Sequence, residues 1–355
     1  MTGKVAQPRV WVISAYRAGE QSQMLALAEA LGWPFELKPV RYREIGRPFE
    51  LFRGTGLFGL TRESAETLAP PWPDLVIGAG MRNEPVCRWV REASGGRTRL
   101  VHVGRPWSDP PAFDLVVATP QYRLADFPQV LQNALTMHRV TPEHIARSVA
   151  RHRQRLEQLP SPRIALMAGG SSGPHAFGTH AATRLAREAS ELAEQVGGSL
   201  MISTSSRTPA QVKDVLRTHI KVPHEFYEWR PEDPENPYFA YLGVADRIIA
   251  TFDSISMLSE ASATGKPLYL FDLDRDHAPG AAEALRDHTL ETLGYRLLLR
   301  FGPRRLGRDI SLVHDRIIAE GRAVWLGERH HGRSVEPSPD VERAVERVRQ
   351  LFSQT

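Results

Sequence analysis

Short β-rich runs alternate with helix-length segments along most of the chain, and this alternation constrains the fold more than any other feature of the sequence. Strands separated by helical segments are typical of βαβ units that build a parallel sheet. A first series has predicted strands at residues 9–14, 74–78, 99–103 and 114–118, with helices at 20–31 and 84–92. A second series has predicted strands at 163–168, 199–204, 224–229, 247–251 and 267–272, with helices at 178–196, 209–219 and 255–263. The sequence therefore predicts two α/β domains in tandem with a cleft between them.

The boundary between the two series is a charged helical stretch at residues 141–159 that ends in Pro160-Ser161-Pro162. Proline removes a backbone donor and disfavours helix, so a break is expected there. We assign residues 1–150 to an N-terminal Rossmann-like domain and 160–335 to a C-terminal one. A closing amphipathic helix is expected within 338–355, where apolar residues recur at helical spacing: Val341, Val345, Val348 and Phe352.

Composition narrows the setting in which such a chain works. The 355 residues include one cysteine, Cys87, so no intrachain disulfide can form and a reducing compartment is expected. No apolar stretch of signal-peptide or membrane-spanning length is visible, which favours a cytoplasmic protein. The net charge of +4 fits phosphate-bearing ligands or peripheral contact with an anionic inner membrane better than it fits nucleic acid.

In open parallel sheets, ligands bind beyond the carboxyl ends of the strands, where free N–H groups at helix N-termini favour anions. The first candidate segment is Gly169-Gly170-Ser171, directly after a predicted strand. Its glycines allow close approach of a ligand, and its serine offers a hydroxyl; a plain glycine turn explains the segment equally well. It matches neither the spaced dinucleotide fingerprint nor a Walker loop, so a dinucleotide cofactor and ATP lose support.

The second candidate segment combines hydroxyl groups with one arginine. Ser205, Arg207 and Thr208 follow the strand predicted at 199–204, and Pro209 suits a first helical turn. Hydroxyls, N–H groups and a guanidinium can converge there on a diphosphate. The alternative is an ordinary Ser/Thr cap beside a solvent-facing arginine.

The third segment is the richest in polar groups. Asp253, Ser254, Ser256 and Met257 stand where the strand at 247–251 leads into a helix, and Glu260 lies one turn beyond Ser256 on the same face. A carboxylate in that position can accept hydrogen bonds from both ribose hydroxyls while the helix N-terminus holds the phosphates. The alternative is a solvated glutamate and a plain cap.

Several of these segments together resemble the elongated-mitochondria family, which includes plant mitochondrial-fission factors and bacterial proteins classed as outer-core glycosyltransferases. The resemblance is carried by Gly169-Gly170-Ser171, the run 205–209, Trp229 with Asn236-Pro237-Tyr238, and the stretch 253–261 with Gly265-Lys266-Pro267.

The resemblance implies the GT-B architecture, with two Rossmann-like domains and a nucleotide-sugar donor in the C-terminal one. Carried over by motif, Glu260 would bind ribose, and Ser254, Ser256 and Met257 would face the diphosphate and donor sugar. The remaining donor-side candidates are Gly169, Gly170, Ser171, Ser205, Arg207, Thr208, Trp229, Asn236 and Asp253. The family commonly has two arginines before Thr-Pro, whereas this chain has Ser206 and Arg207, which removes one phosphate-binding charge.

The acceptor side has fewer signals. Glu20, in the loop after the first predicted strand, is a candidate base for an acceptor hydroxyl, and its alternative is a glutamate favoured by the helix dipole. His102 is a competing base whose alternative is a structural histidine. Gly80 and Arg82 follow another strand and are candidates for acceptor binding, with Arg82 suited to an anionic group.

The spacing of Asp272 and Asp274, with Asp276 and His277 beyond, raises a divalent metal as an alternative. GT-B enzymes generally neutralise the leaving diphosphate with helix dipoles and basic side chains, so no metal and no resident cofactor are expected.

The predicted function is sugar transfer from a nucleotide diphosphate sugar to a cell-envelope glycan, such as lipopolysaccharide core, or to a lipid-linked acceptor. The alternatives are a sugar-nucleotide epimerase of the same fold and a non-catalytic interaction protein related to the fission factors.

Overall fold

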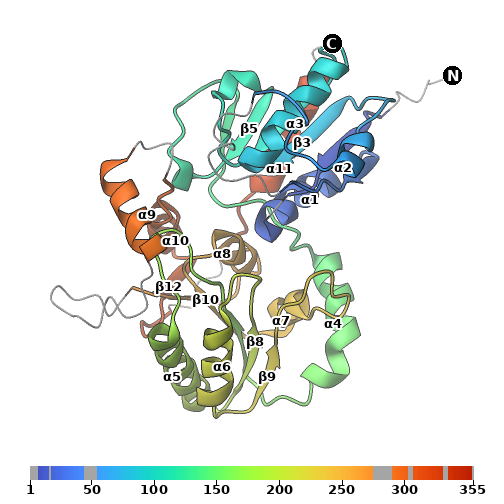
Figure 1. The fold of residues 1–355 in the computed structure, drawn as a ribbon. Coiled ribbons are helices and arrows are strands. Elements are labelled where there is room, and N and C mark those ends of the chain that lie inside the picture. The colour runs from blue at the N-terminus through green and yellow to red at the C-terminus, as the bar shows by residue number, and fades with distance from the viewer. Residues whose placement is uncertain are drawn as a thin grey trace. The chain divides into compact units, whose positions relative to one another are not determined.

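The computed structural model describes residues 7–15, 17–43, 54–274, 290–302, 307–330 and 335–353. The chain divides into two compact units, Met1–Arg139 with Pro339–Thr355, and Val140–Ser338. Figure 1 shows the elements of each unit. No described helix combines the length and the apolar character that crossing a bilayer requires.

The first unit contains a six-stranded parallel sheet in the order β2-β1-β3-β4-β5-β6. The strands are β1 Val10–Ile13, β2 Phe35–Lys38, β3 Leu75–Ala79, β4 Arg99–Val103, β5 Leu115–Ala118 and β6 Val130–Gln132. Its helices are α1 Ala18–Leu31, α2 Arg62–Glu66, α3 Gly80–Ala93 and α11 Asp340–Ser353, with short 3₁₀ turns at Pro110–Ala112 and Pro120–Tyr122.

Both faces of the central strands of this first sheet are buried. Val10 and Val12 pack into one apolar cluster together with α1 and α11, and Trp11 and Ile13 pack into another together with α3. Strands that are buried on both faces read as continuous apolar runs, which is why the sequence pattern located the central strands.

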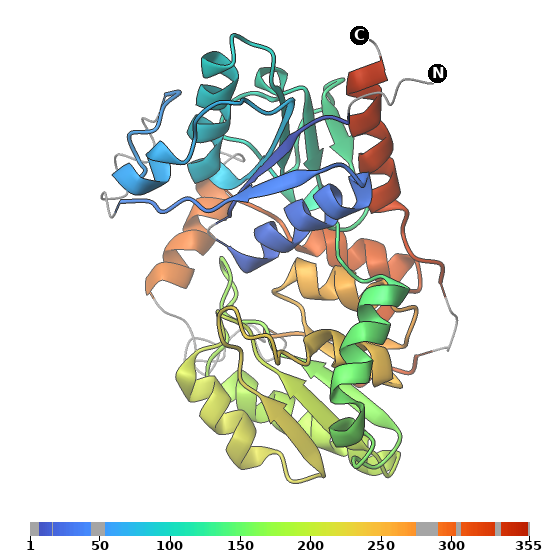
Figure 2. The ribbon, with the colours of Figure 1, turned by 90° about the vertical axis from the view of Figure 1, so that its right-hand side faces the viewer.

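Helix α11 closes the first unit, although it is the last element of the chain. Figure 2 shows it, in red, alongside α1 in blue, and Val345 and Val348 join the apolar cluster that contains Leu27. The Asp340 carboxylate accepts hydrogen bonds from the backbone N–H groups of Ala134 and Leu135, both at 2.8 Å. The chain therefore starts and ends in the same unit.

The second unit contains another six-stranded parallel sheet, in the order β12-β11-β10-β7-β8-β9. The strands are β7 Arg163–Met167, β8 Ser199–Ser203, β9 His224–Tyr227, β10 Arg247–Thr251, β11 Leu268–Phe271 and β12 Ala323–Trp325. Its helices are α4 Pro142–Leu156, α5 Thr179–Gln195, α6 Ala210–His219, α7 Tyr238–Val244, α8 Ile255–Ser262, α9 Leu290–Phe301 and α10 Ser311–Ala319. The helices α5 and α6 lie side by side (Figure 1).

The stretch expected to separate the domains forms α4, and α4 belongs to the second unit. Its apolar residues Ile145 and Val149 pack against α7 so closely that a Cβ on Gly243 would lie 2.6–2.7 Å from their methyl carbons. The change of unit falls at Arg139–Val140, before the helix. In the sequence, the many charged residues of α4 make the few apolar residues that attach it to the second unit hard to recognise.

Candidate functional site

The order of strands in the second sheet defines where a ligand is expected. The chain enters at β7, moves outward through β8 and β9, and returns to the other side of β7 with β10. The loops after β7 and β10 therefore diverge at a topological switch point, which is where open α/β sheets bind ligands. Gly169 follows β7, and Asp253 follows β10.

The carboxylate of Asp253 connects the loops at this point. It accepts hydrogen bonds from the backbone N–H of Gly170 at 2.9 Å, from the Thr251 hydroxyl at 2.7 Å, and from the Arg207 guanidinium at 2.9 Å. Its side chain has no exposed surface. Asp253 therefore positions Arg207 and the glycine loop, whereas the sequence had suggested contact with the ligand itself.

The two glycines are required by close packing. A Cβ on Gly169 would lie 2.4 Å from a carboxylate oxygen of Asp253, and a Cβ on Gly170 would lie 2.2 Å from the carbonyl oxygen of Arg207. Such distances are well inside van der Waals contact, so a side chain at either position would force the loops apart. Gly169 and Gly170 are therefore more than a plain turn, because the packing of the loops requires glycine at both positions.

Ser205 and Thr208 hold the loop after β8 against the loop after β7. The Ser205 hydroxyl donates to the carbonyl oxygen of Gly169 at 3.0 Å, and the Thr208 hydroxyl lies 2.5 Å from the same oxygen. Trp229 joins this arrangement through its backbone N–H, which donates to Thr204 at 2.9 Å. The hydroxyls of Ser205 and Thr208 therefore hold the two loops together, whereas the sequence had assigned both residues to the donor.

Arg207 is the charged group that remains available. Its guanidinium bonds Asp253 and the Ser171 carbonyl oxygen, at 3.2 Å, yet 38% of the side chain is exposed. Ser254 is the N-cap of α8, and Ser256 and Met257 lie half-buried in the first turn. The first N–H groups of a helix have no intrahelical partner and favour anions. The Arg207 guanidinium and the N-terminus of α8 can therefore both attract an anion at this edge of the sheet.

Glu260 lies one turn further along α8 and is 7% exposed. One of its carboxylate oxygens accepts a hydrogen bond of 2.7 Å from the Tyr238 hydroxyl. Asn236 begins the α7 turn, since its side-chain oxygen accepts the Tyr238 N–H at 3.0 Å. Burial, and then the nearby Glu260 charge, keep the pKa of Tyr238 well above its usual range, so the phenol stays a donor. Tyr238 helps to orient Glu260, a role that the sequence did not indicate.

A buried histidine supports the β10 loop from behind. His314 of α10 is 2% exposed, and its Nε2 lies 2.7 Å from the carbonyl oxygen of Phe252. Burial lowers the pKa of His314 to about 4 from its usual 6.5, despite the opposing effect of this hydrogen bond. The folded state therefore favours neutral His314.

We predict that this histidine makes the second unit sensitive to acid. Its stabilising contribution is complete above pH 6.5, the unfolded value, and is lost as the pH falls towards 4. In urea titrations, the free energy of unfolding of the wild type should fall between pH 7 and pH 5 by more than that of His314→Gln. The exposed His219→Gln serves as control and should behave as the wild type; equal losses in all three would contradict the prediction.

The acidic pattern at the end of β11 has structural partners. Asp274 lies 2.5 Å from Nδ1 of His175 and 3.7 Å from the Arg296 guanidinium, while the carbonyl of Asp272 bonds Arg184. Within the described ranges, no group of three or more His, Cys, Asp or Glu side chains is arranged to hold a metal ion. Asp276 and His277 lie outside those ranges.

In the first unit, the switch point lies between β1 and β3. Glu20, in the first turn of α1, meets Gly80 there: a Cβ on Gly80 would lie 2.9 Å from a Glu20 carboxylate oxygen, and the φ of Gly80 is +74°. Arg82 follows two residues later, with its guanidinium carbon 5.9 Å from the Tyr42 ring centre. Glu20, Gly80 and Arg82 therefore belong to one edge of the sheet, as the sequence suggested.

His102 lies on the neighbouring strand β4, with its ring close to the backbone of Gly80. It is 1% exposed and packs against Phe113, with ring centres 5.1 Å apart, and its Nδ1 is 3.3 Å from the Gly104 carbonyl oxygen. Burial lowers its pKa, although the neighbouring Glu84 charge opposes the shift. His102 occupies an inward-facing position in β4, which fits the structural alternative and leaves Glu20 as the candidate base.

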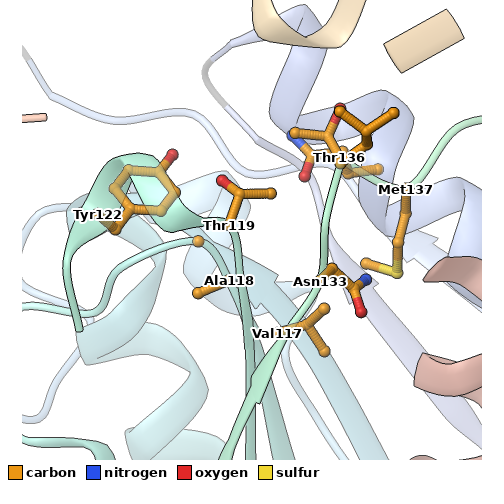
Figure 3. A pocket seen from close by; sticks show the side chains of 10 residues that line it. Val117, Ala118, Thr119, Tyr122, Asn133, Thr136 and Met137 are labelled. Atoms are coloured by element: carbon orange, nitrogen blue, oxygen red, sulfur yellow. The ribbon is translucent and has the colours of Figure 1, made fainter. Parts of the chain in front are cut away.

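The first unit also contains a small, open hollow that the sequence did not indicate. Figure 3 shows Thr119, Tyr122 and Thr136 around it, beside Asn133 and Met137. Gln23 contributes from α1, one turn beyond Glu20. The lining has no charged side chain, so this pocket is suited to a neutral polar group. Its residues come from four separate loops and helices, and no local pattern joins them.

Comparison with known proteins identifies the family. The model of the family described as "Mitochondrial fission ELM1" matches residues 18–290, which is more than half of the chain. The chain belongs to the mitochondrial fission ELM1 family. The Arabidopsis thaliana mitochondrial fission protein ELM1 is 24% identical over 239 residues, covering 61% of this chain and 55% of that protein. An uncharacterized Rickettsia prowazekii protein is 23% identical over 297 residues, covering 74% of this chain and 82% of that protein.

Solved structures confirm the fold class. The Neisseria meningitidis UDP-GlcNAc 2-epimerase bound to UDP-GlcNAc aligns with a TM-score of 0.51 at 12% identity, covering 98% of this chain and all of that one. The fold is thus that of tandem Rossmann-like domains, as predicted. It is shared with GT-B enzymes that use nucleotide sugars. The chain spans about half the length of the Arabidopsis thaliana relative.

Proposed function

We propose that this ELM1-family chain is a glycosyltransferase that moves a sugar from a nucleotide diphosphate sugar to a cell-envelope glycan or a lipid-linked acceptor. The observation that carries the proposal is the arrangement around Asp253 in the second unit. This buried carboxylate holds Arg207 and the glycine loop together at the switch point, beside the N-terminus of α8.

The donor is assigned to that edge of the second sheet. The diphosphate would meet the exposed part of Arg207 and the first turn of α8, with Ser171, Ser254, Ser256 and Met257 around it. The ribose hydroxyls would donate to Glu260, which Tyr238 orients. Both the guanidinium and the helix dipole stabilise the negative charge that develops as the nucleotide leaves, without a metal.

The acceptor is assigned to the first unit. Glu20 would take the proton from an acceptor hydroxyl, whose oxygen then bonds the anomeric carbon while the bond to the diphosphate oxygen breaks and its electron pair leaves with the nucleotide. An acceptor on a lipid or envelope glycan implies work on the cytoplasmic side, in peripheral contact with the inner membrane.

Two alternative functions differ from a glycosyltransferase in the ligands that they require. A sugar-nucleotide epimerase, the activity named for the N. meningitidis structure, would convert a nucleotide sugar with no acceptor present. A non-catalytic platform would bind no nucleotide at all.

We expect a panel of nucleotides and their sugars, including UDP and GDP, to identify at least one compound that raises the melting temperature. Ligand at one hundred times its dissociation constant stabilises a protein by about 2.7 kcal/mol. That corresponds to a rise of roughly 5–10 °C for a unit of this size. Glu260→Ala should reduce the rise, because the ribose loses its acceptor, while Glu235→Ala, an exposed glutamate before α7, should leave it unchanged.

The absence of any shift across the panel would contradict the proposal and favour the platform. Conversion of a nucleotide sugar without acceptor, followed by chromatography, would identify the epimerase.

A further inference from the structure

Helix α9 presents large apolar side chains to solvent. Leu290 is 91% exposed, Leu297 is 61% exposed and Phe301 is 76% exposed. Their spacing of seven and four residues places them on one stripe of the helix. We call these three residues the α9 stripe; the helix is orange in Figure 1.

The opposite side of α9 attaches the helix to the second unit. The Tyr295 ring lies against Gly173, where an added Cβ would be 3.0 Å from it, and Arg296 donates to the Pro174 carbonyl oxygen at 3.3 Å. Thr292 is 5% exposed on the same side. The helix is therefore held through its other face, and the α9 stripe takes no part in these contacts.

The segment that carries the stripe is mostly positive, although Glu291 directly follows Leu290. Residues 292–308 include five arginines and no aspartate or glutamate, while the whole chain has a net charge of only +4. Arg300 is exposed beside the stripe, with its guanidinium carbon 5.5 Å from the Phe301 ring centre. The segment thus combines exposed Leu and Phe side chains with arginine.

Three kinds of partner could cover the α9 stripe: a second copy of the chain, nucleic acid or a lipid bilayer. A second copy of the chain would bring two segments of net positive charge together, which is unfavourable. Nucleic acid would attract the arginines, but it has no apolar layer in which the exposed leucine and phenylalanine side chains could be buried. A bilayer with anionic headgroups matches both features, because apolar side chains enter the acyl boundary while arginines meet the phosphates.

We propose that α9 docks the protein on the surface of an anionic phospholipid bilayer, with the α9 stripe inserted at the acyl boundary and Arg300 among the headgroups. The inference rests on the membrane contact included in the proposed function and assigns it to one helix. Binding to vesicles needs no sugar donor, so a failure here is distinguishable from a failure of glycosyl transfer.

Sedimentation with sucrose-loaded vesicles tests the docking. The wild type should bind vesicles containing a quarter phosphatidylglycerol and bind pure phosphatidylcholine vesicles much less. Replacing the α9 stripe by Leu290→Ser, Leu297→Ser and Phe301→Ser together should lower the partition coefficient by about tenfold or more. Arg300→Gln should weaken binding to the anionic vesicles, and added salt should weaken the binding of the wild type.

The matched control is Phe58→Ser, which removes a 73% exposed phenylalanine from the first unit and should bind as the wild type does. Because every substituted side chain is exposed, melting temperatures should stay close to that of the wild type. Wild-type binding that survives loss of the stripe, or no binding to anionic vesicles, would overturn the proposal. So would a wild-type dimer, seen by light scattering, that the triple substitution dissociates without any vesicle binding.

Discussion

Asp253→Ala is expected to lower the free energy of unfolding of the second unit by about 3 kcal/mol and to abolish nucleotide binding. The substitution leaves the Gly170 N–H, the Thr251 hydroxyl and the Arg207 guanidinium without their shared acceptor. Breaking a buried ion pair by removing one partner typically costs about 3–5 kcal/mol. The lower end applies because Arg207 is 38% exposed and water can solvate it.

Urea denaturation and calorimetric titration with nucleotide measure the two effects of Asp253→Ala. The matched control is Asp246→Ala, at the opposite end of the same strand, where an exposed carboxylate accepts one hydrogen bond of 2.7 Å from the Arg163 N–H. We expect a loss of about 1 kcal/mol there and unchanged nucleotide affinity. Equal effects of the two substitutions would contradict the role given to Asp253.

Gly170→Ala is expected to weaken nucleotide binding by about tenfold or more, which is about 1.4 kcal/mol. The new methyl group would lie 2.2 Å from the Arg207 carbonyl oxygen, a backbone atom that can move only with its loop. Overpacking of this kind typically costs about 1–3 kcal/mol, so stability should fall as well. Calorimetric titration and denaturation would separate the loss of affinity from the loss of stability.

Substitution of a second glycine, Gly198, shows whether a loss of nucleotide affinity comes from the site or from lower stability of the second unit. A Cβ on Gly198 would lie 2.0 Å from the Pro162 carbonyl oxygen, at the amino end of the same sheet. Gly198→Ala should therefore destabilise the unit to a similar extent while the folded protein keeps its nucleotide affinity. If Gly198→Ala lost nucleotide affinity as Gly170→Ala does, the loss of affinity in Gly170→Ala would reflect lower stability of the whole unit.

The central strands could be predicted from sequence because burial on both faces makes them continuous apolar runs. The strand predicted at 247–251 is found as β10, Arg247–Thr251, for this reason. The missed strands lie at sheet edges. In β2, the exposed Phe35 and Leu37 alternate with Glu36 and Lys38, so the segment lacks the continuous apolar run of the central strands.

The return of α11 to the first unit shows a limit of a different kind. The closing helix is visible in the spacing of Val341, Val345 and Val348, but its partner is not. Asp340 accepts the N–H groups of Ala134 and Leu135, about two hundred positions earlier in the chain. A local pattern cannot identify an acceptor for donors that far away.

At the candidate site, the sequence indicated which residues gather but not what each one does. Asp253 and Arg207 come from loops that only the strand order brings together, and their mutual bond makes one a support and the other the exposed charge. His102 shows the same limit, because alternation along β4 turns it inward against Phe113. The assignment of these residues to a bound donor stays a prediction.

Hydrogen exchange of the wild-type chain, followed by mass spectrometry, tests whether a nucleotide binds at the switch point of the second sheet. The amides are compared with and without saturating UDP, and then GDP and CDP. We predict that the nucleotide that binds will slow exchange in three segments that meet at this switch point: residues 168–173, 204–209 and 253–262. Unchanged exchange in these segments with every nucleotide, or protection confined to the first unit, would contradict this prediction.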